Sequence, residues 1–306
     1  MQSGGLCEGA DWVVSAVNDG HSLRFSRLEV ANLLLASCKE RRVPEGHTIH
    51  RLARDLKRDL CGQKLQVQSP QGRFAAECHL LDGDHLQKTD AWGKHLFLHW
   101  KSGRLVHVHL GLYGKFRRHQ SPPPPPRETV RLRMTGVQRC WDLVGPNCCE
   151  LLSDDGLAKL RQRLGADPLR SDADPDTAWQ RIHRSRVAIG SLLLNQSVIS
   201  GVGNIYRAEV LFDQRLSPEL PGNQLTREEF DGIWEKLTEW LAIGVRYNRI
   251  ITTEPDSVGR SRGRMRREER LQVYGREYCT ECDAEIECWE LGNRWMYACP
   301  VCQAAG

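Results

Sequence analysis

Four cysteines near the carboxyl end of this 306-residue chain are its clearest candidates for chemistry. Cys279 and Cys282 form one pair, Cys299 and Cys302 form another, and sixteen residues lie between the pairs. This is the spacing of two thiolate knuckles that close a tetrahedral Zn²⁺ site, with a redox role as the alternative. Because four thiolates leave no open position, the spacing predicts one structural zinc ion. Cys288, between the pairs, is expected to be a spare core thiol.

Three other segments give the cysteine ribbon a more specific context. They are Pro44-Glu45-Gly46-His47-Thr48, Gly93-Lys94-His95-Leu96-Phe97, and Asn195 to Glu209, with its Ser200-Gly201-Val202-Gly203-Asn204 turn. Together with the closing Cys299-Pro300-Val301-Cys302-Gln303, they resemble the formamidopyrimidine-DNA glycosylase and endonuclease VIII family, above all its bacterial, actinobacterial-type endonuclease VIII branch. The resemblance extends from Pro44 to Gln303.

The resemblance implies an α+β multidomain fold with DNA bound in a cleft between domains. Its parts are an amino-terminal β-sandwich with flanking helices, a carboxy-terminal helix-two-turn-helix domain and a zinc ribbon. Sequence periodicity agrees, because apolar residues at helical spacing predict a helix that begins at Pro44, and residues 96–100 and 105–110 have the character of strands. We expect the catalytic domain at 44–164, a linker at 165–176, the helical domain at 177–269 and the ribbon at 270–306.

Within this family pattern, Pro44 is the expected nucleophile. A terminal α-amino group titrates roughly two to three pH units below a lysine, so it is largely deprotonated near neutral pH. The secondary amine of Pro44 can then attack C1′ of a damaged nucleoside, and the resulting iminium ion drives elimination of the phosphates. Glu45, beside it, can exchange a proton with the opening sugar oxygen. Its alternative role is that of an ordinary first-turn carboxylate.

Three more residues match family positions that contact DNA phosphates. Lys94 is implied to contact a phosphate that flanks the lesion. Asn204 matches a phosphate-binding asparagine, and Gly201 and Gly203 are expected to let backbone amides approach a phosphate. Arg294, five residues before Cys299, matches the arginine of the zinc hairpin, whose guanidinium can hold two phosphate oxygens.

A base that is excised must leave the duplex, so side chains must fill the space it vacates. Leu112 and Tyr113 resemble the endonuclease VIII wedge, with ordinary core strand residues as the alternative. The formamidopyrimidine branch has a methionine there and a separate Arg-Phe pair, which the segment 141–145 lacks. The resemblance therefore favours oxidised pyrimidines as substrates.

Two features depart from the family pattern. Thr48 stands where enteric members carry a glutamate, which leaves a catalytic role for this position open. Pro44 is also internal as numbered, and an acylated proline nitrogen has no nucleophilic lone pair. Residues 1–43 show no domain pattern, and we interpret them as a non-native extension from a mis-assigned start, with Val43 encoded by a GTG start codon. Lys39-Glu40 can be encoded as a ribosome-binding sequence at a suitable distance.

Composition sets the remaining expectations. The net charge of +4 and pI near 8.5 are mildly basic, but residues 246–276 hold nine arginines, no lysine and four acidic residues, a net charge of +5. That stretch is either a solvated loop or a surface that follows phosphates. No apolar run long enough to span a membrane and no signal peptide is present. We expect a monomer in a bacterial cytoplasm, associated with the nucleoid and acting on double-stranded DNA with oxidised bases or abasic sites.

Two other functions remain open at this point. One is a non-catalytic protein that binds lesions but has a blocked Pro44. The other is a glycosylase specialised for 8-oxoguanine or formamidopyrimidine. The favoured function is a bifunctional glycosylase and lyase of base excision repair, which cuts the strand by β,δ-elimination.

Overall fold

The computed structural model describes residues Val17–Asn18, His21–Ser22 and 44–304. The chain separates into two compact units, Met1–Val43 and Pro44–Gly306. In the first unit, strand β1 (Val17–Asn18) pairs antiparallel with β2 (His21–Ser22). The other expectations for residues 1–43, including the mis-assigned start, lie outside the described residues.

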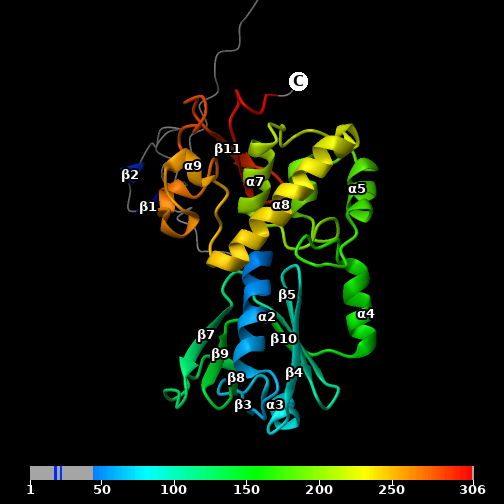
Figure 1. Cartoon of the computed structure of the whole chain (residues 1–306), viewed down its shortest axis with the longest axis vertical. Coiled ribbons are helices and arrows are strands. Elements are labelled where there is room, and N and C mark those ends of the chain that lie inside the picture. Colours follow the sequence, from blue (N-terminus) through cyan, green and yellow to red (C-terminus); the bar gives the residue numbers. More distant parts are fainter. Residues whose placement is uncertain (1–16, 19–20, 23–43, 305–306) are drawn as a thin grey trace, which may run out of the picture. The chain divides into compact units, whose positions relative to one another are not determined.

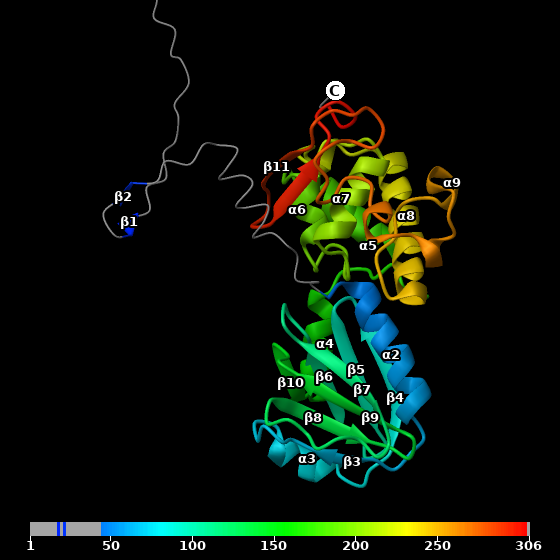
Figure 2. The same ribbon diagram turned by 90° about the vertical axis from the view of Figure 1, so that its left-hand side faces the viewer.

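The amino-terminal part of the second unit is a β-sandwich of two antiparallel four-stranded sheets (Figures 1 and 2). One sheet has the order β10 (Cys148–Leu151), β6 (Leu105–His109), β5 (His95–Trp100) and β4 (Leu86–Trp92). The other has the order β3 (Gln66–Gln68), β8 (Val130–Thr135), β9 (Arg139–Val144) and β7 (Lys115–Gln120). The strand predictions at 96–100 and 105–110 are thus confirmed by β5 and β6.

Three helices accompany the sandwich. They are α2 (Gly46–Leu60), α3 (Ala75–Leu81) and α4 (Asp154–Arg163). Two of them, α2 and α3, contribute to the main core of the sandwich. Ile49, Leu56 and Leu60 on α2 are buried with Leu98 and Leu132 from the two sheets. The prediction that this helix begins at Pro44 was wrong by two residues. The helix begins at Gly46, because Glu45 is its N-cap with an extended backbone (φ −108°, ψ 177°).

The carboxy-terminal part is helical and ends in a two-stranded ribbon. Its helices are α5 (Pro175–His183), α6 (Ile189–Leu194), α7 (Asn204–Asp213), α8 (Arg227–Tyr247) and α9 (Pro255–Val258), with short 3₁₀ turns at Gly222–Gln224, Arg262–Arg264 and Arg267–Glu269. The ribbon consists of β11 (Glu287–Glu290) and β12 (Trp295–Ala298). Met296 and Tyr297 are buried with Phe212 and Leu237, so the ribbon shares the core of the helical part.

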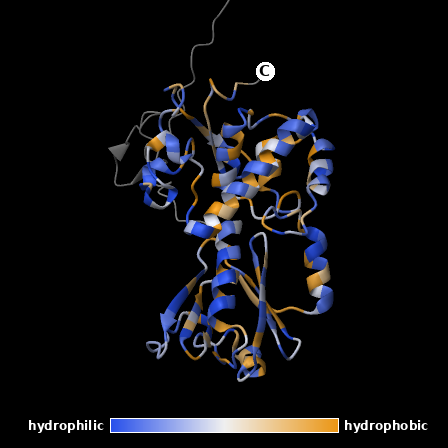
Figure 3. Cartoon of the chain, viewed as in Figure 1, coloured by the Kyte–Doolittle hydropathy of each residue, from blue (hydrophilic) through white to orange (hydrophobic). Residues whose placement is uncertain are grey.

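Helix α8 shows why this part folds as it does. Its buried residues Phe230, Ile233, Leu237, Trp240 and Leu241 recur at helical spacing, and its remaining face is more hydrophilic (Figure 3). Thr226 and Glu229 form a capping box at its start. None of the helices in the described part of the chain is both long and apolar enough to cross a membrane.

Helix α2 connects the sandwich to the helical part. At its carboxyl end, the buried Asp59 accepts hydrogen bonds from Arg118 on β7 (2.5 and 2.9 Å), from Arg58 (3.0 Å) and from the Trp141 indole on β9 (3.0 Å). At its amino end, Arg51 donates to the carbonyl oxygens of Val245 and Arg246, at the end of α8. The position of Pro44 and Glu45 therefore depends on contacts at both ends of α2.

We predict that Asp59→Asn weakens the fold through this network. Burial alone would raise the pKa of Asp59, but bonds from Arg118, Arg58 and Trp141 lower it from 3.8 to about 2. The carboxylate should thus contribute about 2 kcal/mol above pH ~4, and this is lost as the pH falls towards 2. Removing the charge near neutral pH leaves Arg118 without its partner and should cost on the order of 3 kcal/mol in urea unfolding.

Asp172→Asn is the matched control, because Asp172 pairs with Arg170 at 2.7 Å while its side chain is 62% exposed. This exposed pair should contribute less than about 1 kcal/mol. Equal losses of unfolding free energy in the two variants would contradict the stabilising role of Asp59. So would a loss in Asp59→Asn that does not become smaller at low pH.

Candidate functional site

Glu45 binds the amino end of α7 with its carboxylate. It is only 2% exposed, and it accepts hydrogen bonds from the backbone amides of Gly203 (2.9 Å) and Ile205 (3.1 Å). These amides lie at a helix amino terminus, whose dipole favours a negative charge. Half-buried Pro44 directly precedes this residue. These hydrogen bonds fix Glu45 beside the predicted nucleophile. Glu45 thus caps the amino end of α7 with its side chain and is also the N-cap residue of α2.

The glycines around Glu45 allow three segments to meet. A Cβ on Gly203 would lie 2.3 Å from the Glu45 Cδ atom, and one on Gly46 would lie 2.8 Å from the Cα of Gly201. The Gly46 amide also donates to the Gly201 carbonyl oxygen at 2.8 Å. The sequence predicted that Gly201 and Gly203 let backbone amides approach a phosphate. Their own amides are bonded within the protein, that of Gly203 to Glu45 and that of Gly201 to the Gln196 side chain. Gly203 and Gly201 instead provide close packing.

Asp167 joins the same segments from the predicted linker. This carboxylate is 1% exposed, and it accepts from His50 on α2 (2.7 Å), from the Gly93 amide (2.6 Å) and from the Leu169 amide (2.9 Å). Gly93 has a φ of +56°, and a Cβ there would lie 2.8 Å from that of Ser200. Asp167 therefore sets the position of Lys94, the next residue along the chain. Sequence analysis treated 165–176 only as a connector and missed this role.

Lys94 lies within the electrostatic range of two other predicted site residues. Burial lowers the pKa of Lys94, Glu45 opposes that effect, and Arg294 adds to it. The three charges are therefore close enough in the fold to influence one another, although they lie far apart in the sequence. The structure brings Glu45, Lys94 and Arg294 into one region.

Arg294 lies in the turn between β11 and β12, where its side chain is exposed. Arg207 on α7, which is fully buried, supports this turn through hydrogen bonds to its backbone. Arg207 donates to the carbonyl oxygens of Gly190 (2.9 Å), Leu291 (2.9 Å) and Arg294 (3.1 Å). Burial lowers its pKa to about 10, so Arg207 stays charged at neutral pH. Arg207 thus positions Arg294 without itself reaching solvent.

Asn204, the first residue of α7, is held by the ribbon. Its amide nitrogen donates to the Trp295 carbonyl oxygen (2.8 Å) and to the Tyr274 hydroxyl (3.1 Å). Both protons of this amide are therefore used within the protein. A phosphate oxygen that accepts a hydrogen bond from Asn204 would have to replace one of these two acceptors. The Tyr274 hydroxyl is the easier one to replace, because it can rotate and act as a donor instead.

Leu112 and Tyr113 lie on the turn between β6 and β7. Their side chains are 44% and 64% exposed, which excludes the alternative that they are core strand residues. Gly111 at φ +65° begins the turn, and a Cβ on Gly114 would lie 2.3 Å from the Leu110 carbonyl oxygen. The turn thus presents two adjacent apolar side chains to solvent on a tightly constrained backbone.

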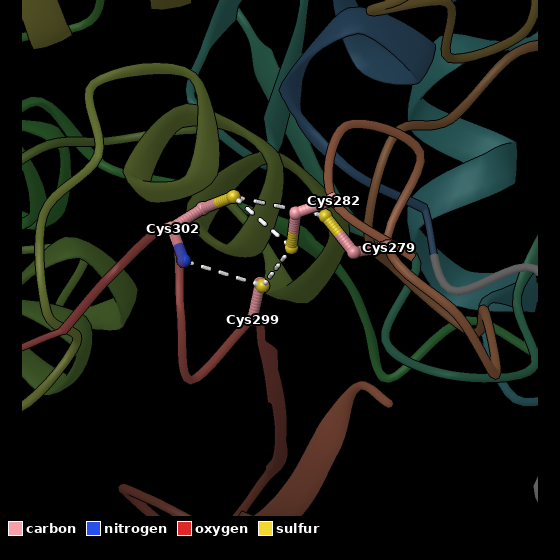
Figure 4. Close-up of side chains that lie close together, drawn as sticks. All are labelled: Cys279, Cys282, Cys299 and Cys302. Carbon is pink, nitrogen blue, oxygen red and sulfur yellow. Dashed lines mark hydrogen bonds between the residues drawn. The ribbon is translucent and has the colours of Figure 1, made fainter. Parts of the chain in front are cut away.

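The four cysteines of the ribbon converge on one point (Figure 4). The Sγ atoms of Cys282 lie 3.5 Å from Cys299 and 3.6 Å from Cys302, and Cys279 lies 3.9 Å from Cys302. A tetrahedral zinc ion with Zn–S bonds of about 2.3 Å would separate its sulfurs by about 3.8 Å. The amides of Glu281 and Cys302 donate to sulfurs of this group. The group fits a structural zinc ion, while Cys288 lies outside it and is exposed, not in the core as expected.

Glu209 connects α7 to the segment that leads into the ribbon. The sequence did not predict this role. Glu209 is fully buried, and it accepts from the amides of Gln272 (2.7 Å), Val273 (3.0 Å) and Tyr274 (2.7 Å) and from the Thr252 hydroxyl. The available signal was two charged residues, Arg207 and Glu209, flanked by apolar residues in the middle of the helix. Buried charges need such partners, so both had to bind another segment.

The arginine-rich segment 246–276 is largely engaged with itself. Arg260 pairs with Glu269 (2.8 Å), Arg262 pairs with Glu254 (2.7 Å), and Arg276 donates to backbone carbonyl oxygens within the segment. Their contacts give the segment a defined structure.

Two family models match the chain. The formamidopyrimidine-DNA glycosylase N-terminal domain matches residues 43–144, and the formamidopyrimidine-DNA glycosylase H2TH domain matches residues 164–256. These ranges correspond to the sandwich and to the helices that carry Asn204 and Arg207. The ribbon lies beyond both ranges.

Similar proteins and structures extend the match over nearly all of the second unit. Endonuclease 8 1 of Mycobacterium tuberculosis is 45% identical over 267 residues, which cover 85% of this chain and 100% of the relative. Formamidopyrimidine-DNA glycosylase of Geobacter metallireducens is 28% identical, with the same coverage. A structure of MutM with carbocyclic 8-oxo-G containing DNA has a TM-score of 0.71 at 25% identity, covering 86% of this chain and 100% of that one. Lactococcus lactis Fpg with abasic-site DNA has a TM-score of 0.70 at 25% identity, covering 85% and 100%.

We predict that zinc removal unfolds residues 270–303 and also loosens α7. The ribbon shares its core with the helices, and Arg207 and Glu209 would lose their partners. Hydrogen exchange is followed by mass spectrometry with and without a chelator. The chelator should reduce amide protection in both segments and leave the protection of β5 and β6 unchanged. Unchanged protection of 270–303 in metal-free protein would contradict the structural role.

Proposed function

Because the chain belongs to the formamidopyrimidine-DNA glycosylase and endonuclease 8 family of base excision repair glycosylases, we propose that it is a bifunctional glycosylase and abasic-site lyase with Pro44 as its nucleophile. The observation that carries the proposal is the burial of Glu45 against α7, with Lys94 and Arg294 within electrostatic range. The two similar structures named above, of MutM and of Lactococcus lactis Fpg, contain DNA with a lesion or an abasic site. Double-stranded damaged DNA is the corresponding substrate here.

The proposed reaction begins at the nitrogen of Pro44. Its lone pair forms a bond to C1′, and the glycosidic bond breaks with its electron pair leaving on the base. The Glu45 carboxylate directly follows Pro44 in the chain, so it is proposed to take the proton from the new ammonium group. It then passes the proton to O4′ as the sugar ring opens. The products are an iminium ion on Pro44 and the base anion, which takes a proton from water to give the free base.

Strand cleavage follows from that iminium ion. It acidifies C2′, and loss of a C2′ proton expels the 3′ phosphate. Loss of a C4′ proton to water then expels the 5′ phosphate in a second elimination. Water finally hydrolyses the iminium ion and frees Pro44. Lys94, Asn204 and Arg294 are the proposed phosphate contacts. In support, Lys94 and Arg294 bring two positive charges to the region of Glu45, and such charges bind phosphates.

This reaction requires a free amine on Pro44, whereas in the 306-residue sequence that nitrogen is acylated by Val43. We therefore propose that the active form begins at Pro44, through initiation at Val43 and removal of the initiator. In support, the family match begins at residue 43, and a separate compact unit begins at Pro44.

We propose oxidised pyrimidines as the preferred lesions. In support, the 45% identity to an endonuclease 8 exceeds the 28% identity to a formamidopyrimidine-DNA glycosylase. Leu112 and Tyr113 are exposed on one turn, as a wedge requires. Trp141, Asp142 and Leu143 are buried in β9, so this segment offers no side chains of its own for insertion into DNA.

The nucleophile is tested by borohydride trapping on abasic-site DNA, with two forms of the protein. The form that begins at Pro44 should become covalently linked to DNA, whereas the form that retains Val43 should bind the same DNA without linkage. Pro44→Gly, with a primary amine, controls for the chemistry of the ring. Equal trapping of the Val43-blocked form would contradict the proposal and support another nucleophile.

Lesion preference is tested by comparing single-turnover excision of thymine glycol and 8-oxoguanine from matched duplexes. Thymine glycol should be removed faster, and Leu112→Ala should slow its removal by about tenfold or more, because the vacated stack is no longer filled. Val137→Ala is the control, since Val137 is 80% exposed on a different turn. Faster removal of 8-oxoguanine would support the formamidopyrimidine-type alternative.

A further inference from the structure

A second group of metal-binding side chains lies on the sandwich, apart from the ribbon. Besides the four ribbon cysteines, the part of the chain that the structure describes holds one further such group, His107 with Cys148 and Glu150. The ligand atoms of these three residues all lie within 4.8 Å of one another. None of the three has a role in the proposed glycosylase reaction.

Strand register explains why these side chains converge. Strands β6 and β10 are antiparallel neighbours, with Glu150 opposite His107 and Cys148 opposite His109. Residues two apart on a strand point to the same face, so Cys148, Glu150 and His107 share one face of the sheet. Two hydrogen-bonded strands therefore hold the three side chains in place without any contribution from a loop.

The distances match the coordination sphere of a small divalent cation. The His107 Nδ1 atom lies 3.0 Å from a Glu150 oxygen and 3.7 Å from the Cys148 Sγ atom. A tetrahedral zinc ion would separate nitrogen from oxygen by about 3.4 Å and nitrogen from sulfur by about 3.6 Å. Shifts of a few tenths of an ångström would thus seat the ion. A thiolate and a carboxylate would also balance its two positive charges.

A neighbouring histidine orients the central ligand. The His107 Nε2 atom lies 2.8 Å from the His95 Nδ1 atom, which leaves Nδ1 of His107 facing Cys148 and Glu150. A hydrogen bond to the second ring nitrogen is the usual support of a metal-bound histidine. His107 is 5% exposed, Cys148 is half-buried, and the Glu150 side chain is 52% exposed, so the group opens to solvent on one side.

We propose that His107, Cys148 and Glu150 form a second metal site for Zn²⁺ or a similar borderline divalent cation, with water in the remaining coordination position. On binding, the Cys148 thiol gives up its proton to solvent, and the ion replaces the hydrogen bond between His107 and Glu150. The ion would fix β6 and β10 together. Lys94 directly precedes His95, the first residue of β5, and the turn that carries Leu112 follows His109, the last residue of β6. By stabilising these strands, the metal would help to position Lys94 and Leu112.

The test adds Co²⁺ to the full chain whose ribbon already holds zinc. One equivalent should bind with a thiolate-to-cobalt charge-transfer absorption, and alkylation of Cys148 should slow by about tenfold or more, because a metal-bound thiolate is protected. Alkylation of Cys149, which points to the opposite face, should not change. Cys148→Ser and Glu150→Gln should each abolish this absorption, whereas Glu128→Gln, at an exposed carboxylate elsewhere, should retain it.

Glu150 is exposed, so Glu150→Gln tests the site without disturbing the core. Cobalt absorption that persists in Cys148→Ser would show exchange into the ribbon and would overturn the proposal. So would binding without a charge-transfer band, or equal protection of Cys148 and Cys149. The test does not involve DNA, so its outcome is independent of the proposed glycosylase activity.

Discussion

The hydrogen bonds between the Glu45 carboxylate and the amino end of α7 are the constraint on which the rest of the structure depends. They join residues 158 and 160 positions apart in the sequence, at distances of 2.9 and 3.1 Å. One carboxylate thereby fixes the start of α2, the glycine-rich turn and the first turn of α7. Because it is buried, any group that displaced it would leave two helix-terminal amides without an acceptor, which is costly in an apolar interior.

Two further buried charges connect α7 to the ribbon and to the segment before it. Arg207 and Glu209 are both buried, and each is hydrogen-bonded to backbone groups of the ribbon or of the segment before it, although the Nε atom of Arg207 has no partner among the described residues. A charge buried in this way favours this position of the ribbon, because moving the ribbon would remove its hydrogen-bond partners. The fold of the zinc-binding segment is thus tied to the helix whose amino end holds Glu45. Metal binding, ribbon position and the geometry at Pro44 form one connected system.

Much of this could be predicted from the sequence, and the remainder could not, for physical reasons. Local patterns suffice for the cysteine pairs, for β5 and β6, and for α2 apart from the residue at which it starts. The start of α2 shifted to Gly46 because Glu45 bonds to a distant helix, and no local pattern reports such a contact. Asp167 was missed for the same reason, since an aspartate before a proline also favours an ordinary loop. The role of Gly203 depended on which group approaches it, which only the fold decides.

The most direct test of this account uses the form that begins at Pro44 and measures the base-excision rate of Gly203→Ala. The comparison is Gly263→Ala in the same form, where an added Cβ meets only a Tyr247 ring atom at 3.5 Å. The account predicts a loss on the order of a hundredfold for Gly203→Ala, because the methyl group displaces the Glu45 carboxylate. Gly263→Ala should stay close to the parent rate. In a Glu45→Gln background the Gly203 change should cost little more. A Gly203→Ala protein that folds normally and excises bases at the parent rate would contradict the central role of this contact.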